Sequence, residues 1–285
     1  MDPKKLLKWV LPHGVVRLVQ SRQERGYRLG RAALAIQQNA PPLGLAPAAM
    51  IDFLVGRGLR RDQVTEGSMP AESLEFLAGF VRERCRGGDP LRGLHIGNFV
   101  GVSLTFFAGV AAAIHPGSVV VAVDPNIPHR GISHPQDHVC ALLEHVGLAH
   151  HVLLTCGFSR ARNVGDDGRN YLENYRLLEP AEARTRVGAE HAPDRALDHL
   201  VALGVAGFDF VLLDGNHEAA YVADELDFLR PLLKPGALVF LDDVSEGWPL
   251  LKQLFEGAAA GNFRALAADG RVGVLEAPGG QNLPA

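Results

Sequence analysis

Short apolar runs alternate with longer stretches of helical periodicity from about residue 67 to the end of the chain. The runs are continuously hydrophobic rather than alternating, which indicates strands buried on both faces, as in a parallel sheet covered by helices. Glycine, proline or aspartate bounds each run, as expected where strands pass into turns. The pattern predicts strands over residues 91–97, 118–124, 151–156, 208–214 and 237–243.

Helical stretches fill the intervals between these strands, and a hairpin closes the pattern. Asp269 and Gly270 form a two-residue hairpin signal between two further apolar runs, so the last two strands are expected to pair antiparallel. We therefore predict an α/β, Rossmann-like, doubly wound sheet of seven strands, mostly parallel, with a C-terminal antiparallel hairpin and an N-terminal helical extension. The predicted helices cover 101–114, 135–147, 194–204 and 217–233.

Three segments lie outside this alternation. Residues 1–66, which contain a break at Pro41 and Pro42, are predicted to form a helical cap or arm ahead of a domain over residues 67–277. Residues 160–193 are polar and interrupt the domain as an insertion, at a position where a lid over a site would lie. Residues 278–285 form a tail.

The net charge of −4 conceals two unlike parts, because residues 1–31 hold eight Lys and Arg against Asp2 and Glu24 and leave about −10 for the rest. An acidic body argues against nucleic acid as a partner. The basic arm is expected to pack on its own domain or on a second subunit of a homo-oligomer, with contact to an anionic membrane surface as the alternative.

The location predicted for the chain is cytoplasmic, with attachment to the inner membrane surface as the alternative. No apolar run approaches the length that crosses a bilayer, and the three cysteines lack metal-ligand spacing.

Functional residues are expected directly after the strands, because an open parallel sheet binds its ligand at the carboxyl ends of its strands. Gly97 and Gly101 permit a sharp turn into a helix, either for a ligand or for packing alone. Asp124 follows the second strand at a spacing typical of a carboxylate that binds ribose hydroxyls. Gly157, Phe158 and Ser159 follow the third strand and offer a turn, a ring and a hydroxyl to an adenine.

The fourth and fifth strands end in acidic residues. Asp214 follows one, and Asp242 and Asp243 follow the other, where a turn of the strand would let both share one ligand. Three carboxylates suit Mg2+ or another hard divalent cation. His217 lies three residues after Asp214, near enough to act as a base. The alternative is that Asp214 and Asp243 cap helices and that His217 is a surface histidine.

These strand ends together resemble a class I S-adenosylmethionine-dependent methyltransferase. The group concerned carries an Asp-Gly-x-His strand end followed by a Leu-Leu-x-Pro-Gly-(x)n-Asp-Asp strand, and residues 212–243 match it most specifically. The resemblance covers about residues 67–277. It extends to the macrocin-type sugar O-methyltransferases and, more distantly, to the catechol and caffeoyl-CoA O-methyltransferases.

The resemblance implies a role for each of these residues. S-adenosylmethionine is the implied cofactor, Mg2+ or a similar cation is the implied metal, and His217 with Asp214 forms the implied catalytic set. The family has Glu or Asp, which helps hold the cofactor's ammonium group, where this chain has His95, although a neutral imidazole can accept a hydrogen bond there. The implied cofactor-binding residues are His95, Gly97, Asn98, Phe99, Gly101, Ser103, Asp124, Gly157, Phe158 and Ser159, and the implied metal ligands are Asp214, Asp242 and Asp243.

The acceptor implied by this resemblance is a hydroxyl of a sugar, on a natural product or a glycan, with a catechol-like phenol as the alternative. Trp248 either stacks on the acceptor or packs within the protein. Two rival functions stay open, a nicotinamide-dependent oxidoreductase, which the absent GxGxxG disfavours, and a cofactor-binding subunit without activity. His129, His134 and His138 superficially suggest a second metal site, but the start of a helix at His134 explains them better.

Overall fold

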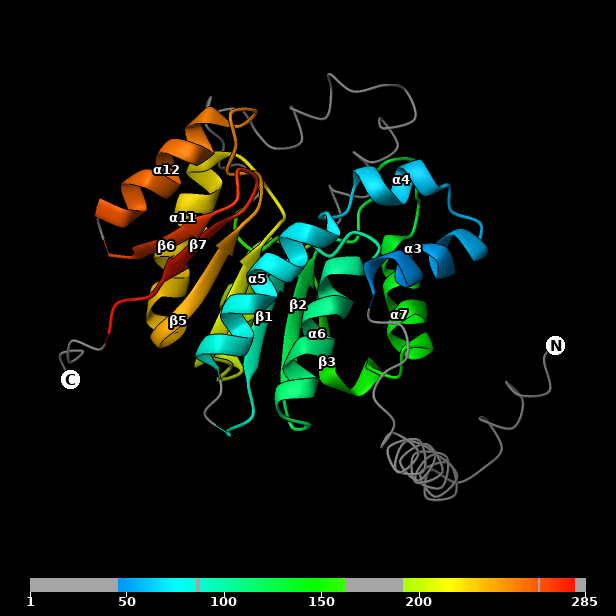
Figure 1. The fold of residues 1–285 in the computed structure, drawn as a ribbon, viewed down its shortest axis with the longest axis horizontal. Coiled ribbons are helices and arrows are strands. Elements are labelled where there is room, and N and C mark those ends of the chain that lie inside the picture. The colour runs from blue at the N-terminus through cyan, green and yellow to red at the C-terminus, as the bar shows by residue number, and fades with distance from the viewer. Residues whose placement is uncertain (1–45, 86–87, 162–191, 261, 280–285) are drawn as a thin grey trace, which may run out of the picture. The chain divides into compact units, whose positions relative to one another are not determined.

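The computed structural model describes residues 46–85, 88–161, 192–260 and 262–279 (Figure 1). The basic arm (residues 1–31) and nearly all of the predicted 160–193 insertion lie outside the described residues, so their predicted roles stay predictions.

Within the described residues, seven strands form one sheet in the order β3-β2-β1-β4-β5-β7-β6 (Figure 1). The five strands β1 to β5 run parallel, and β7 pairs antiparallel with both β5 and β6. The predicted fold class and the terminal hairpin are therefore confirmed. The strands are β1 (Arg92–Ile96), β2 (Val119–Asp124), β3 (Val152–Cys156), β4 (Phe208–Leu213), β5 (Leu233–Leu241), β6 (Arg264–Ala268) and β7 (Gly273–Glu276).

Helices cover both faces of the sheet, as continuous strand hydrophobicity requires. One core cluster joins α3, α5, α6 and α7 to one face, and a second joins α10, α11 and α12 to the other. The helices are α3 (Pro47–Gly56), α4 (Arg61–Glu66), α5 (Ala71–Arg84), α6 (Val102–Ile114), α7 (Pro135–His145), α10 (Ala196–Ala202), α11 (Ala219–Leu229) and α12 (Pro249–Ala260), with 3-10 turns η1 (Ala149–His151) and η3 (Arg230–Leu232).

Aromatic rings fill the centre of the first core. Phe107 on α6 lies with its ring centroid 5.9 Å from that of Phe210 and 5.8 Å from that of Phe240. All three side chains are fully buried, so α6 is fixed against the middle of the sheet. The turn that precedes α6 is fixed with it, and this turn carries the glycines singled out in the sequence.

Two predicted boundaries were wrong. Strand β5 begins at Leu233 rather than at residue 237, because Leu233 pairs with Phe208 ahead of a register irregularity and Lys234 forms an ion pair with Asp209. Helix α11 begins at Ala219, so His217 lies in the loop before the helix rather than in its first turn. A loop position frees the imidazole from the constraints of a helical rotamer.

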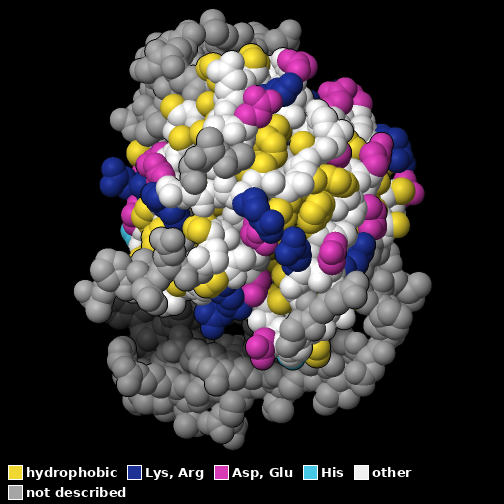
Figure 2. Space-filling model, turned by 60° about the vertical axis from the view of Figure 1, so that its left-hand side comes forward, with side chains coloured by type: hydrophobic (Ala, Val, Ile, Leu, Met, Phe, Trp, Pro, Cys, Tyr) yellow, Lys and Arg dark blue, Asp and Glu magenta, His cyan; other side chains and the backbone are white. Residues whose placement is uncertain are grey.

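The surface seen in Figure 2 mixes Lys and Arg with Asp and Glu, and neither sign forms a continuous area among the coloured residues. Such a face lacks the basic stripe that binds a phosphate backbone. Of the helices described, none combines the length and the hydrophobicity that a membrane span requires.

Candidate active site

The register of the sheet brings the predicted site residues into one row. Ile96 on β1 pairs with Val123 on β2 and with Leu213 on β4, and Leu213 pairs with Leu241 on β5. The next residue along each of these strands therefore stands at the same edge of the sheet. These residues are Gly97, Asp124, Asp214 and Asp242.

The turn after β1 depends on its two glycines. Gly97 has φ of 86°, and a Cβ built there would lie 2.0 Å from the carbonyl oxygen of Asp214. Gly101 has φ of 92° at the N-cap of α6, and a Cβ there would lie 3.2 Å from the Cα of Val139. Phe99 between them also has a positive φ, of 46°. Close approach of β4 and α7 thus requires glycine whether or not a ligand is bound.

Asp124 holds this turn in place. Its carboxylate accepts hydrogen bonds from the backbone N–H groups of Asn98 at 2.6 Å, Phe99 at 3.2 Å and Asn126 at 2.6 Å. Burial raises the pKa of this carboxyl above its usual value, and the three hydrogen bonds partly offset the rise. A carboxylate accepts about four hydrogen bonds, so capacity is left for a hydroxyl.

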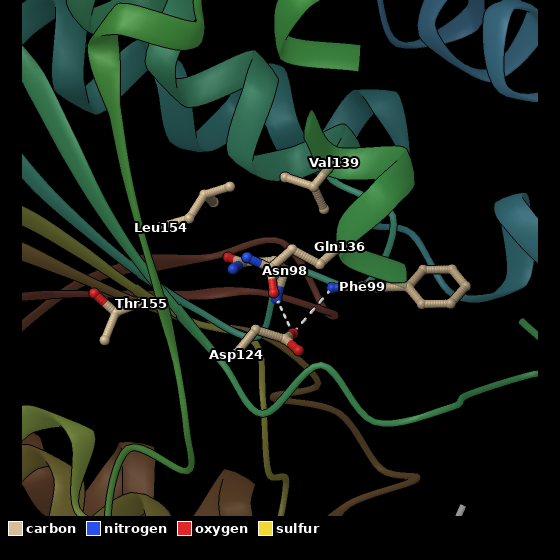
Figure 3. A pocket seen from close by; sticks show the side chains of 7 residues that line it. All are labelled: Asn98, Phe99, Asp124, Gln136, Val139, Leu154 and Thr155. Atoms are coloured by element: carbon tan, nitrogen blue, oxygen red, sulfur yellow. Dashed lines mark hydrogen bonds between the residues drawn. The ribbon is translucent and has the colours of Figure 1, made fainter. Parts of the chain in front are cut away.

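A pocket opens beside Asp124 (Figure 3). Its walls combine the polar turn after β1 with apolar side chains from β3 and α7. The lining residues are Asn98, Phe99, Asp124, Gln136, Val139, Leu154 and Thr155.

Gln136 marks the first turn of α7, which forms one wall of this pocket. Its backbone N–H donates to the side chain of Asn126 at 2.9 Å. Asn126 thus supplies a cap that the sequence analysis did not identify.

His95 is buried on β1 at 1% exposure. Its Nε2 lies 3.0 Å from the hydroxyl of Ser103, whereas its Nδ1 has no hydrogen-bond partner among the described residues. The amide oxygen of Asn98, also buried, has none there either. Burial lowers the pKa of His95 to about 3, a shift that the Asn98 side chain partly opposes, so the imidazole is neutral at physiological pH. Two buried polar atoms without partners at the glycine turn fit a polar ligand group that binds there.

Gly157, Phe158 and Ser159 follow β3 but do not line the pocket beside Asp124. Phe158 is buried, and the hydroxyl of Ser159 donates to Glu225 and lies 3.1 Å from the hydroxyl of Tyr221. This hydroxyl is therefore engaged inside the protein. The role of these three residues at an adenine stays a prediction.

Glu225 on α11 is 1% exposed, and burial raises the pKa of its carboxyl from 4.5 to about 8. The hydroxyl of Ser159 and the charge of Arg160 oppose this rise, and the neighbouring Asp224 adds to it. The folded protein therefore keeps Glu225 protonated at a pH where the unfolded chain has already ionised it. Its contribution to stability is complete below about pH 4.5 and is lost as the pH rises toward about 8.

In the wild type the free energy of unfolding should fall by up to about 5 kcal/mol between these two pH values, and Glu225→Gln is expected to remove this fall because the amide cannot ionise. Urea unfolding at a series of pH values measures this slope. Glu256→Gln, on the exposed face of α12, is the matched control and should leave the slope as in the wild type. Equal slopes for Glu225→Gln and the wild type would contradict the raised pKa.

The acidic residues after β4 and β5 meet as predicted. Asp243 has φ of 57°, so the chain turns sharply after β5, the condition under which adjacent residues can face one ligand. Burial, followed by the neighbouring carboxyl of Asp242, raises the pKa of Asp214 well above its usual value. Asp242 is 2% exposed, and the side chain of Asp243 is 23% exposed.

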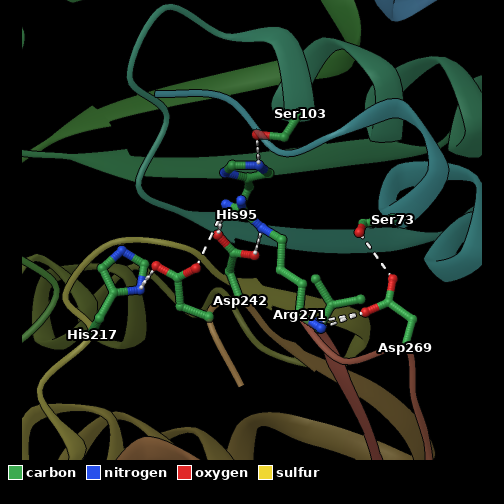
Figure 4. Close-up of polar contacts among 9 residues, drawn as sticks. Ser73, His95, Ser103, His217, Asp242, Asp269 and Arg271 are labelled. Carbon is green, nitrogen blue, oxygen red and sulfur yellow. Dashed lines mark hydrogen bonds and ion pairs between the residues drawn. The ribbon is translucent and has the colours of Figure 1, made fainter. Parts of the chain in front are cut away.

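A residue that the sequence analysis did not select lies among these carboxylates. Arg271, in the hairpin between β6 and β7, donates from Nε to one oxygen of Asp242 at 3.0 Å and from Nη2 to the other at 2.9 Å (Figure 4). Its Nη2 also lies 3.7 Å from Asp243. The sequence contained a signal for this residue, because the hairpin predicted at Asp269 and Gly270 turns back at the sheet edge where β5 ends.

Two of the three predicted metal ligands, Asp242 and Asp243, therefore contact a cation of the protein itself. No group of three His, Cys, Asp or Glu side chains within the described ranges has the geometry to hold a metal ion, at Asp214, Asp242 and Asp243 or around His129. Both oxygens of Asp242 carry N–H donors, so this arrangement does not fit a divalent cation, which would need them as ligands.

His217 faces the acidic cluster from the other side. Its Nδ1 lies 3.4 Å from a carboxylate oxygen of Asp243, and its ring centroid lies 5.3 Å from that of Trp248. Burial lowers the pKa of His129 to about 4, and Arg130 and His217 add to this shift. His129 in turn contacts Phe99 edge to face, with centroids 5.4 Å apart. The indole ring of Trp248 thus lies against the imidazole of His217.

Three features of this structure are those of the α/β methyltransferase class. They are a doubly wound sheet with a reversed last strand, a glycine turn after the first strand and an acid after the second. The sequence model of one family, described as a methyltransferase domain, matches residues 94–244. The chain belongs to this family and is a methyltransferase. The matched range begins within β1 and ends just beyond Asp243, so it contains every residue of the proposed site except Arg271 and Trp248.

Solved structures share the fold. The O-methyltransferase TomG from Streptomyces achromogenes, solved in complex with SAM, is 18% identical with a TM-score of 0.51, and the match covers 86% of this chain and 95% of that one. The O-methyltransferase from Bacillus cereus, solved in complex with SAH, is 15% identical with a TM-score of 0.52, covering 86% of this chain and 96% of that one. A search among curated proteins finds no match to the chain. Family membership disfavours the oxidoreductase considered above.

Proposed function

We propose that the chain transfers a methyl group from S-adenosylmethionine to a hydroxyl oxygen. The observation that carries the proposal is the placement of His217, held by Asp243, at the same sheet edge as the glycine turn and Asp124. The partnerless Nδ1 of His95 and amide oxygen of Asn98 fit the polar end of an amino-acid cofactor. The bound SAM and SAH of the two structural neighbours support the choice of cofactor.

When bound, S-adenosylmethionine supplies an electrophilic methyl group. The chain then has to align an acceptor oxygen and remove its proton. A carboxylate oxygen of Asp243 lies 3.4 Å from Nδ1 of His217, and this contact favours the tautomer that has its proton on Nδ1 and a free lone pair on Nε2. Nε2 takes the proton of the acceptor hydroxyl, and Asp243 stabilises the imidazolium that forms.

The acceptor that we propose is a sugar hydroxyl, on a natural product or a glycan. The ring of Trp248 is 41% exposed beside His217, so it offers a flat apolar surface next to a base. Sugars present an apolar face of C–H groups to such a ring and leave their hydroxyls free for polar partners. The same surface suits a catechol-like phenol, which is the second candidate.

Calorimetric titration with S-adenosylmethionine, and with NAD as the comparison, tests the cofactor. We expect saturable binding of the first and none of the second. Radiolabelled methyl transfer to methyl rhamnoside and methyl glucoside, compared with catechol, tests the acceptor class. Binding of NAD in place of S-adenosylmethionine would overturn the proposal, and transfer to catechol alone would select the second candidate.

Asp124→Ala is expected to weaken S-adenosylmethionine binding about tenfold to a hundredfold, because charge-assisted hydrogen bonds to the ribose are lost and the turn after β1 loses its anchor. Calorimetry measures the affinity. Asp137→Ala, an exposed acid of α7 outside the pocket, is the matched control and should bind as the wild type does. Unchanged affinity in Asp124→Ala would remove this carboxylate from the cofactor site.

A further inference from the structure

Strand pairing places Arg271 at the end of β5. Gly273, the first residue of β7, pairs with Leu241, the last residue of β5, and the two strands are antiparallel. Continuing this register by two residues sets Arg271 opposite Asp243. A long side chain at this position therefore reaches the carboxyl edge of the sheet, although it comes from a hairpin far along the chain.

The hairpin is held firmly in this position. One oxygen of Asp269 accepts the backbone N–H groups of Arg271 and Val272, both at 2.8 Å, and the other accepts the hydroxyl of Ser73 on α5 at 2.9 Å (Figure 4). Asp269 thus both closes the turn and anchors it to the helical layer. The guanidinium is presented from a rigid support, which lowers the entropy lost when it binds carboxylates.

The guanidinium makes the contacts that a bridging cation would make. It binds both oxygens of Asp242 in a planar fork, with N–O distances of 3.0 Å and 2.9 Å, and its Nη2 lies 3.7 Å from Asp243. Asp243 is the residue whose other oxygen lies 3.4 Å from Nδ1 of His217. A continuous series of contacts therefore runs from Arg271 through Asp243 to the proposed base.

We propose that Arg271 takes the place of a divalent cation in this site and acts as a positioning residue: its guanidinium binds Asp242 and Asp243, orients Asp243 toward His217, and lets the enzyme work without a metal. The part of this inference that concerns turnover rests on the proposed function, whereas the part that concerns cation binding does not. A divalent ion that entered the cluster would have to displace the fork from Asp242 and would be repelled by it.

Titration of the full-length protein with Mn2+, followed by electron paramagnetic resonance, tests the cation-binding part without any assay of activity. The wild type is expected to leave Mn2+ free at micromolar concentrations. Arg271→Ala is expected to bind one Mn2+ about a hundredfold more tightly, because the carboxylates lose the competing charge. Arg271→Lys, which keeps a cation, should behave like the wild type.

Arg264→Ala is the matched control, because Arg264 lies on β6 of the same hairpin and pairs with Glu276 away from the cluster. Micromolar binding of one Mn2+ by the wild type would overturn the proposal, and this result does not depend on any variant. A folded Arg271→Ala, judged by circular dichroism, without gain in Mn2+ affinity would also overturn it. If alanine prevents folding, Arg271→Gln, which keeps hydrogen-bond donors without the charge, replaces it in the same comparison.

Methyl transfer gives the second readout. The wild type should turn over at the same rate, within about twofold, in EDTA and in Mg2+. Arg271→Ala should lose activity in EDTA and regain it at least in part in Mg2+, which a purely structural role of Arg271 would not produce. A wild type that requires Mg2+ would overturn the inference. Absence of transfer to every acceptor would overturn the proposed function instead, and the Mn2+ titration would then decide the role of Arg271.

Discussion

His217→Gln is expected to lower turnover about a hundredfold to ten-thousandfold, the usual contribution of a general base, while the affinity for S-adenosylmethionine changes little. The imidazole lies beside Asp243 and Trp248, where we propose that the acceptor binds, whereas the pocket that we propose for the cofactor lies beside Asp124. Loss of the base should therefore separate kcat from cofactor binding. Radiolabelled methyl transfer and calorimetry measure the two quantities.

The pH–rate profile sharpens this test, because loss of the proposed base should change the profile of His217→Gln relative to that of the wild type. His199→Gln, at an exposed position of α10, is the matched control and should keep full activity and the same profile. A His217→Gln enzyme with a normal rate and profile would show that another group removes the proton.

Gly97→Ala is expected to destabilise the fold by more than about 3 kcal/mol and to abolish cofactor binding. The added Cβ would lie 2.0 Å from the backbone oxygen of Asp214, in a residue whose φ of 86° already disfavours a side chain. Relief requires β1 and β4 to move apart, which would break the row of residues at the sheet edge. Urea unfolding and calorimetry with S-adenosylmethionine measure the two losses.

Gly58→Ala separates the two causes. Gly58 also has a positive φ, of 96°, but a Cβ there meets nothing within 4 Å. Its substitution should cost only about 1–2 kcal/mol from backbone strain and should leave cofactor binding intact. Equal losses in the two variants would mean that strain alone, rather than the contact with Asp214, makes glycine necessary at position 97.

Most of the fold could be predicted from the sequence because its signals are local. Buried parallel strands read as continuous apolar runs, and Asp269 with Gly270 marks a tight turn, whatever the rest of the chain does. Errors arose where pairing overrode local composition. Lys234, Pro235 and Gly236 look like a loop, yet the ion pair with Asp209 and the pairing of Leu233 draw this segment into β5.

The row of candidate residues also followed from the sequence, since the carboxyl ends of parallel strands must share one edge. Asp124, Asp214 and Asp242 were placed there by strand ends alone. The partners of each side chain did not follow. The hydroxyl of Ser159 donates a hydrogen bond to Glu225, 66 residues further along the chain, and no local sequence pattern encodes this contact.

The sequence by itself determined the strands and helices along the chain, the sheet edge at which the candidate residues lie and the residue types gathered there. Only the tertiary structure decided which charges neutralise one another. Asp242 and Arg271 stand 29 residues apart, and their pairing depends on the antiparallel register of β7 against β5 and on the anchoring of the hairpin to α5. Three carboxylates in a sequence predict a metal site, whereas in the structure two of them, Asp242 and Asp243, lie against the guanidinium of Arg271.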